Sequence, residues 1–215
     1  MKNVYFISGL GATRHSFDFL DLSFCNPVFV DWVPTIKKET LAEYALRLRQ
    51  TIPESNPVIV GLSFGGMLAS EIANADPGAK AILISSNKCS AEFPAYLRVG
   101  NYVPAYKWLP NSIVRRANWA LKYFFNARGK AQQEVQLQIL RQTDMRFTKA
   151  AIEMILRWKS ATVPTNVLHI HGTADKLLPY KLVKPDYTIE GGTHLMVMDK
   201  GAEISEILKE IIVDN

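Results

Sequence analysis

The sequence predicts an α/β fold built on a parallel sheet, and three observations lead to that prediction. Short apolar runs typical of buried strands alternate along the chain with longer segments typical of helices. Such alternation favours parallel strands joined by right-handed crossovers. The chain has 215 residues, 48% of them hydrophobic, which suits one domain with one good core.

The first half of the chain supplies four of the predicted strands. We expect strands at residues 3–7, 28–30, 57–60 and 81–84, and helices at 40–52 and 67–74. The helix at 40–52 carries Leu41, Tyr44 and Leu48 on one face, and Pro53 lies just beyond its end. An amphipathic helix of this kind packs its apolar face on a sheet.

The last third of the chain returns to the same alternation. Strands are expected at 166–171 and 186–190, and a closing helix at 202–213. Ile204, Leu208 and Ile211 recur at helical spacing in that closing segment. These elements add two strands and one covering helix to the predicted sheet.

A serine at a predicted strand-to-helix turn is the first candidate for chemistry. The segment GLSFGG at residues 61–66 directly follows an apolar strand and precedes a helix. A serine at such a sharp turn projects its hydroxyl out of the sheet, and the crowded backbone needs small neighbours, which Gly61 and Gly65 supply. A helix that begins with a serine cap is the alternative. The strand-turn-helix context favours a nucleophile at Ser63.

Two loops downstream supply a candidate acid and a candidate base for this serine. The fifth predicted strand ends in HGTAD, which puts Asp175 in the following loop, and the sixth ends in GGTH, which puts His194 in the next. The carboxyl ends of parallel strands share one edge of the sheet, so we expect these side chains to meet there. Asp31 also follows a strand and competes as the acid. Asp175 is preferred because its loop neighbours that of His194.

A Gly-rich loop after the first strand completes the predicted site. The sequence SGLGA at residues 8–12 can turn a backbone N–H toward a reacting carbonyl group. We assign an oxyanion hole to the backbone N–H groups of Leu10 and Phe64. Phe64 also begins the helix after Ser63, where the helix dipole favours negative charge.

These four segments resemble those of the α/β-hydrolase superfamily. The matching pieces are SGLGA, GLSFGG, HGTADKLLP and GGTH, and they span residues 8–194. The resemblance implies an α/β-hydrolase fold trimmed to about six parallel strands, with helices on both faces. It also implies Ser63 as nucleophile, Asp175 as acid and His194 as base, in the chain order that this fold uses. Many relatives have a histidine at the position of Ser8, a difference that concerns substrate positioning rather than the triad.

Residues 87–160 interrupt the alternation between the fourth and fifth strands. A single crossover helix would suffice there, yet the segment is far longer and carries helical patterns at 130–141 and 148–159. We predict a helical cap at 87–160, inserted over the active site into a core formed by residues 1–86 and 161–215.

The predicted cap is rich in aromatic rings and in positive charge. Its rings are Phe93, Tyr96, Tyr102, Tyr106, Trp108, Trp119, Tyr123, Phe124, Phe125, Phe147 and Trp158. Rings above a catalytic serine favour an apolar pocket for an acyl group, although any single ring more often serves packing. The cap holds 13 basic and 4 acidic residues, a net charge of +9. This charge favours an anionic acyl carrier such as a coenzyme A thioester, and solvated helix faces are the alternative.

Together these features predict hydrolysis of a small-molecule carboxylic ester or thioester through an acyl-enzyme intermediate. A cofactor-free lyase or a perhydrolase can use the same triad, and a ligand-binding receptor can retain it with incidental hydrolysis. Both alternatives stay open, because the fold does not fix the function. Haloalkane dehalogenase and epoxide hydrolase chemistry is disfavoured, because those relatives have an aspartate at the position of Ser63.

Other functional classes are disfavoured by what the sequence lacks. It has no dinucleotide fingerprint and no phosphate loop, so no cofactor is expected. His169 and His171 alternate on one strand and could ligate zinc, but no third ligand with suitable spacing stands out, and no metal is expected. No recognition motif accompanies the positive charge, which argues against a nucleic-acid partner.

The expected location is the cytoplasm. No apolar run approaches the roughly 18 residues of a membrane span, and the N-terminus has no signal-peptide pattern. Cys25 and Cys89 lie in unlike contexts and are expected to be free thiols.

Overall fold

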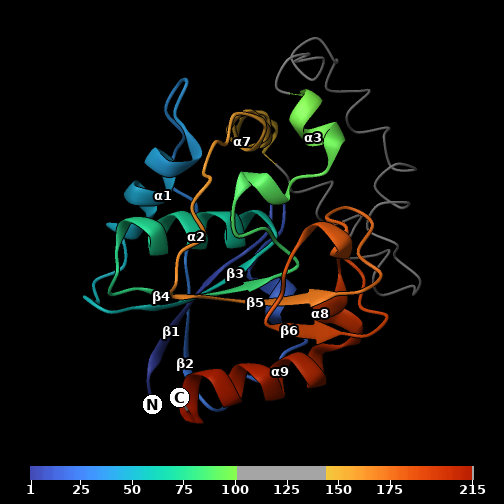
Figure 1. The fold of residues 1–215 in the computed structure, drawn as a ribbon. Coiled ribbons are helices and arrows are strands. Elements are labelled where there is room, and N and C mark those ends of the chain that lie inside the picture. The colour runs from blue at the N-terminus through green and yellow to red at the C-terminus, as the bar shows by residue number, and fades with distance from the viewer. Residues whose placement is uncertain (101–143, 215) are drawn as a thin grey trace.

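The computed structural model describes residues 1–100 and 144–214. Within these residues, a six-stranded parallel sheet has the strand order β2-β1-β3-β4-β5-β6. Helices cover both faces of this sheet (Figure 1). The predicted α/β fold with about six parallel strands is therefore confirmed.

The elements follow the predicted alternation closely. The strands are β1 (Asn3–Ile7), β2 (Asn26–Phe29), β3 (Val58–Leu62), β4 (Lys80–Ile84), β5 (Val167–Gly172) and β6 (Tyr187–Ile189). The α-helices of the described residues are α1 (Leu41–Arg49), α2 (Phe64–Ala75), α3 (Ala95–Gly100), α7 (Met145–Leu156), α8 (Met196–Asp199) and α9 (Gly201–Lys209). Short 3₁₀ turns lie at 14–17, 90–92 and 180–182, and a π-helical turn at 210–214 follows α9.

Two apolar clusters lie on opposite faces of the sheet, because successive strand residues point to opposite sides. One cluster joins the strands to α1 and α2 and includes Tyr44, Leu68 and Leu83. The other joins them to α8 and α9 and includes Ile82 and Leu208. Figure 1 shows α1, α2 and α7 above the sheet and α9 below it. The sheet is thus shielded from water on both sides, as parallel sheets require.

The strand register gathers the predicted site at one edge of the sheet. Ile7 of β1 lies opposite Gly61 of β3, and Leu62 of β3 lies opposite Ile84 of β4. On the other side of β4, β5 and β6 end together, with Gly172 opposite Ile189. The loops that follow these strands therefore emerge beside one another.

The segment between β4 and β5 leaves and rejoins the core at one place. Ser90 donates two hydrogen bonds to the carbonyl oxygen of Ser160, from its backbone N–H at 2.9 Å and from Oγ at 2.8 Å. The described parts of this segment form α3 and α7, on the same face of the sheet as α2 (Figure 1). The helix expected at 148–159 corresponds to α7, which begins and ends earlier.

Other expectations for the cap lie outside the described residues. They are the helix at 130–141 and the rings Tyr102, Tyr106, Trp108, Trp119, Tyr123, Phe124 and Phe125. The division into a core and an inserted cap at 87–160 stays a prediction.

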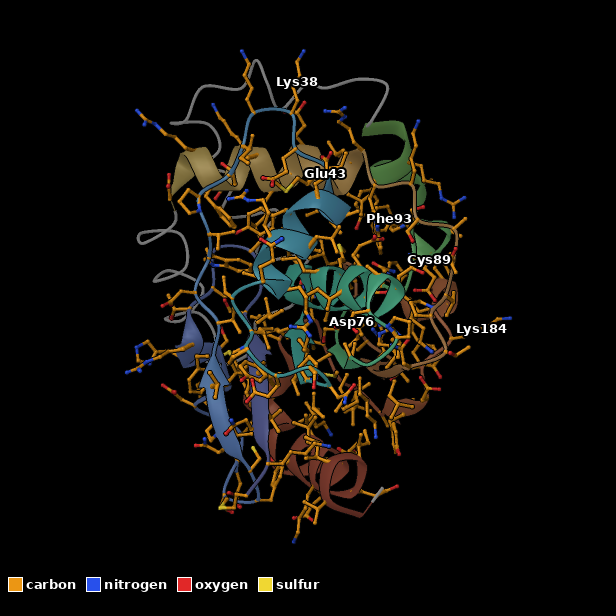
Figure 2. The ribbon with its side chains drawn as sticks, turned by 90° about the vertical axis from the view of Figure 1, so that its left-hand side faces the viewer. Lys38, Glu43, Asp76, Cys89, Phe93 and Lys184 are labelled. Carbon is orange, nitrogen blue, oxygen red and sulfur yellow. The ribbon has the colours of Figure 1, made fainter. Side chains whose placement is uncertain are left out.

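A buried hydrogen bond ties the end of α7 to the core. Trp158 Nε1 donates to Glu71 Oε1 of α2 at 2.6 Å, and both residues are buried. The ring of Phe93 packs edge-on against Trp158, with centroids 5.2 Å apart. Figure 2 shows Phe93 between α2 and the helices above it. These two predicted cap rings thus serve packing.

No helix among the described residues is long and apolar enough to cross a membrane. Cys25 and Cys89 are both buried free thiols, and burial raises the pKa of Cys25 to about 11.

We expect the hydrogen bond between Trp158 and Glu71 to contribute to the stability of the fold. Trp158→Phe should lower the free energy of unfolding by about 1–3 kcal/mol, because it leaves a buried carboxylate oxygen without its donor. Glu71→Gln keeps an acceptor for the indole N–H and should cost less. Urea denaturation of the two variants and the wild type measures both effects. Equal stability of Trp158→Phe and wild type would contradict the structural role of this bond.

Candidate active site

Ser63 lies at the sharp turn between β3 and α2. Its backbone dihedrals are φ 52° and ψ −114°, a conformation that few non-glycine residues adopt. Hydrogen bonds hold it there: Ser63 N donates to Ile84 O at 2.9 Å, and Ser63 O accepts from Gly66 N at 2.9 Å and from Ser86 Oγ at 2.6 Å. The surrounding backbone therefore fixes the direction of the serine side chain.

The glycines around Ser63 are required by close backbone contacts. A Cβ atom at Gly61 would lie 2.4 Å from the Gly65 carbonyl oxygen, and one at Gly65 would lie 2.2 Å from the Ile7 carbonyl oxygen. A Cβ at Gly66 would meet the Ser86 side chain at 2.5 Å. No real Cβ tolerates such distances, so α2 can approach β1, β3 and β4 this closely only with glycine at these positions.

The structure brings Ser63, His194 and Asp175 into one chain of hydrogen bonds. Ser63 Oγ lies 2.9 Å from His194 Nε2, and His194 Nδ1 lies 2.9 Å from Asp175 Oδ2. The carboxylate accepts only, so Nδ1 carries the proton and Nε2 accepts from the serine hydroxyl. His194 and Asp175 are buried, whereas Ser63 is half-buried. Asp31, the competing candidate, is exposed and is not the partner of His194 Nδ1.

The Asp175 carboxylate is held from its other side by its own loop. Its Oδ1 atom accepts from the backbone N–H groups of Leu177 and Leu178, both at 2.8 Å. Burial by itself raises the pKa of Asp175, but the charge and hydrogen bond of His194, with smaller contributions from His171 and the Leu178 N–H, bring that pKa below its usual value. Asp175 is therefore ionised at neutral pH despite its burial.

The Gly-rich loop after β1 lies against the serine. A Cβ atom at Gly9 would stand 3.4 Å from Ser63 Cβ. Leu10 follows directly, and Phe64 follows Ser63 as the first residue of α2. Among the described residues, the backbone N–H groups of Leu10 and Phe64 donate no hydrogen bond. Two backbone donors near the serine are thus available to a ligand.

Three aromatic rings from separate elements meet beside the serine turn. Trp32 follows β2, Phe64 begins α2 and Phe147 belongs to α7. The centroid of Trp32 is 5.7 Å from that of Phe64 and 5.0 Å from that of Phe147. Trp32 and Phe147 are half-buried. Of the rings expected in the cap, Phe147 therefore lies next to the residue that follows Ser63.

Two polar residues near the site were missed by the sequence reasoning. Ser86 holds the Ser63 carbonyl group, and its place just after β4 at the same sheet edge was the signal that could have revealed it. Tyr96 of α3 donates its hydroxyl hydrogen bond to the carbonyl oxygen of Leu177, in the loop of Asp175. Burial, with the negative charge of Asp175, raises the pKa of Tyr96 to about 12. Nothing in the local sequence around Tyr96 points to this contact.

The two histidines of β5 face each other in the core. His169 Nε2 lies 3.0 Å from His171 Nδ1, and both side chains have no exposed surface. Burial lowers the pKa of His171, and it lowers that of His169 well below the usual value. Within the described residues, no group of three or more histidine, cysteine, aspartate and glutamate side chains is arranged to hold a metal ion.

Comparisons with known proteins identify the family and the fold of the chain. A model described as "Alpha/beta hydrolase family" matches residues 4–207. No curated protein matches the sequence. Solved structures share the fold: a thermophilic esterase from Thermogutta terrifontis has a TM-score of 0.71 at 14% identity, covering 100% of this chain and 90% of its own.

Two further structures show how widely the fold is shared. A lipase-esterase related protein from Clostridium acetobutylicum has a TM-score of 0.71 at 15% identity, covering 98% of this chain and 94% of its own. An epoxide hydrolase from Bacillus megaterium has a TM-score of 0.67 at 14% identity, covering 97% and 92%. At such identities the likeness concerns the fold alone.

The buried histidines predict how stability depends on pH. The unfolded chain binds protons at His169 and His171 below about pH 6.5, whereas the folded chain, with its lowered pKa values, does not. The free energy of unfolding should therefore fall as the pH drops below this value, by up to about 1.4 kcal/mol per pH unit for each histidine. Asp175 adds nothing in this window, because its lowered pKa makes its contribution disappear only at more acidic pH.

Urea denaturation at about pH 7.5 and about pH 5.5 measures this dependence. His169→Gln should reduce the change in the free energy of unfolding between the two pH values by the contribution of one histidine. A wild-type stability that is the same at both pH values would contradict the neutral, buried state of the pair.

Proposed function

Because the chain belongs to the alpha/beta hydrolase family, we propose that it is a serine hydrolase that cleaves a carboxylic ester or thioester. Ser63 is the nucleophile, His194 the general base and Asp175 the residue that orients His194. The observation that carries this proposal is the unbroken hydrogen-bonded chain from Ser63 Oγ through both nitrogens of His194 to Asp175 Oδ2. A nucleophile, a base and an orienting acid in this geometry are what acyl transfer requires.

The first half of the reaction forms an acyl-enzyme. His194 Nε2 takes the hydroxyl proton as Ser63 Oγ attacks the substrate carbonyl carbon, and the carbonyl oxygen becomes an oxyanion. When the tetrahedral intermediate collapses, the bond to the alcohol or thiol breaks, and the leaving group takes the proton from His194. Asp175 stabilises the imidazolium that exists between these two transfers.

The second half releases the acid. Water attacks the acyl carbon and gives a proton to His194 Nε2. Collapse of the second intermediate breaks the bond to Ser63 Oγ, which recovers that proton, and a carboxylic acid leaves. The same three residues thus serve both halves without a cofactor.

The oxyanion binds the backbone N–H groups of Leu10 and Phe64. The 3.4 Å approach of a Gly9 Cβ position to Ser63 Cβ supports this assignment, because it brings the loop of Leu10 against the serine. Phe64 adds the positive end of the α2 dipole. Removing one such donor in other hydrolases costs about 3 kcal/mol in the barrier, so this contact is a large part of the expected rate enhancement.

The acyl group of the substrate lies against Trp32 and Phe147, which pack on the buried ring of Phe64. Their rings form one contact group from the core and from α7, beside the turn of Ser63. An apolar wall with a few polar groups is typical of small-molecule sites. The core of residues 1–86 and 161–215 then supplies the chemistry, and the cap at 87–160 selects the substrate, with its positive charge favouring anionic acyl carriers.

The fold alone does not choose this reaction, because an epoxide hydrolase has a similar structure. Family members that open epoxides place an aspartate where this chain has Ser63. A serine with its base at 2.9 Å supports attack on a carbonyl group instead.

Covalent labelling tests the nucleophile. A fluorophosphonate probe should label the wild type at Ser63 and should not label Ser63→Ala, because the reactive hydroxyl is gone. Ser205→Ala, which removes a buried serine of α9 on the far face of the sheet, serves as the matched control and should label like the wild type. Equal labelling of Ser63→Ala and wild type would show that Ser63 is not the nucleophile.

The acid is tested by a change that keeps its shape. Asp175→Asn should lower kcat for an ester by roughly 10⁴-fold, because an amide favours the wrong tautomer of His194. Asp31→Asn should keep wild-type kcat, since Asp31 is exposed and does not contact His194. Steady-state kinetics with a chromogenic ester measures both. A large loss in Asp31→Asn and a small one in Asp175→Asn would exchange the two roles.

A further inference from the structure

The two buried histidines of β5 lie beside the proposed acid. His171 is the last residue but one of β5, four residues before Asp175, and its Nε2 atom lies 2.8 Å from the carbonyl oxygen of Leu178. His169 stands two residues earlier on the same face, with its Nε2 atom 3.0 Å from His171 Nδ1. The serine, the base and the acid of the proposed mechanism use neither ring.

The partners of these rings determine where the protons are. A carbonyl oxygen only accepts, so His171 Nε2 carries a hydrogen and donates to Leu178. In the neutral ring, His171 Nδ1 is then an acceptor, and the hydrogen between the rings belongs to His169 Nε2. The donors therefore all point one way, from His169 through His171 to the loop of Asp175.

That loop holds the carboxylate at both ends. Leu178 offers its carbonyl oxygen to His171 and its N–H to Asp175 Oδ1 at 2.8 Å. The Nε2 atom of His171 lies 3.6 Å from Asp175 Oδ2, the oxygen that accepts the hydrogen bond of His194. A shift of His171 would thus move the loop and withdraw a positive dipole from the carboxylate.

The arrangement costs stability. His169 Nδ1 is buried and has no hydrogen bond of good geometry in the described part of the chain, and a backbone interaction with Ser86 offsets only part of the effect of burial on the pKa of His169. A buried acceptor without a partner costs about 1–3 kcal/mol, and an apolar pair of similar shape would avoid that cost. Packing alone therefore gives no reason for two histidines at these positions.

We propose that His171, oriented by His169, is a positioning residue that holds the Asp175 loop so that the carboxylate meets His194 Nδ1. This inference rests on the proposed function and deepens it. The neutral N–H of His171 supports the negative charge of Asp175 without supplying a full positive charge that would compete with the imidazolium of His194. It acts on the rate of the chemical steps and not on substrate binding.

Two substitutions separate positioning from packing. His171→Phe keeps a ring and removes the donor, so kcat for an ester should fall about tenfold or more, the size of effect that loss of an outer hydrogen-bond partner has at metal sites, while KM stays nearly unchanged. His171→Gln restores an N–H donor toward Leu178 and should recover kcat to within about threefold of wild type. Ser205→Ala, which removes a buried hydrogen bond on the other face of the sheet, should keep wild-type kcat.

A measurement on the wild type does not depend on how the variants fold. The ¹⁵N shifts of the histidine side chains report which ring nitrogen is protonated. Both His169 and His171 should be neutral at pH 7 with the proton on Nε2. A proton on His171 Nδ1 would overturn the inference, as would a His171→Phe variant with wild-type kcat or a His171→Gln variant as impaired as His171→Phe.

The kinetics distinguish this inference from the proposed function. If Ser63→Ala turns over the ester like the wild type, the proposed function fails and the role of His171 fails with it. If Ser63→Ala is inactive and His171→Phe keeps wild-type kcat, only the role of His171 is overturned.

Discussion

The contact between the serine turn and the three central strands is the constraint on which the rest of the site depends. Backbone atoms approach so closely there that a Cβ at Gly65 would lie 2.2 Å from a carbonyl oxygen of β1. This contact fixes how near α2 lies to the sheet and forces Ser63 to a φ of 52°. The strain is balanced by the hydrogen bonds of Ser63 to Ile84 and Ser86. The serine hydroxyl consequently has one direction, and the loops of the base and the acid need only reach it.

Burial of the polar residues has opposite effects on their charge states. Asp175 keeps its negative charge because His194, His171 and two backbone N–H groups offset the cost of removing it from water. For His169 the cost of burial and the nearby charges of His171 and Lys88 outweigh a backbone hydrogen bond at Ser86, so its pKa falls well below the usual value and the ring is neutral. A low-dielectric surrounding strengthens every favourable contact of the carboxylate and penalises every unpaired group. The hydrogen-bond partners of each buried side chain thus decide whether it is charged or neutral.

Much of the fold could be predicted because it depends on local patterns. The apolar runs that became β1, β3, β4 and β5 are short, buried and bounded by turns, so they indicated strands without knowledge of their neighbours. The strand order could not be read in the same way, since it depends on pairings between segments far apart. The four-residue helix α8 was missed because one turn has no periodicity to detect.

The same distinction between local patterns and distant contacts applies to the candidate site. Ser63, Asp175 and His194 stood out because each follows a strand in a distinctive loop, and one sheet edge collects such loops. The contacts of Trp158 with Glu71 and of Tyr96 with Leu177 join residues more than 80 positions apart, and no local pattern encodes them. The alternation of His169 and His171 showed that their side chains share one face of a strand, but it could not show that their ring nitrogens face each other and a backbone carbonyl group.

The two hydrogen bonds between Ser90 and Ser160 have a consequence for how this family of folds can diversify. Although these serines lie 70 positions apart in the sequence, the chain leaves the core and returns to it at the same place. The entropic cost of closing a loop grows only slowly with its length, so the segment between the two serines can lengthen, shorten or be exchanged with little effect on the stability of the sheet. The pairing of β4 with β5 would stay the same. Substrate preference can therefore evolve, or be engineered, by replacing this segment while the catalytic core is kept.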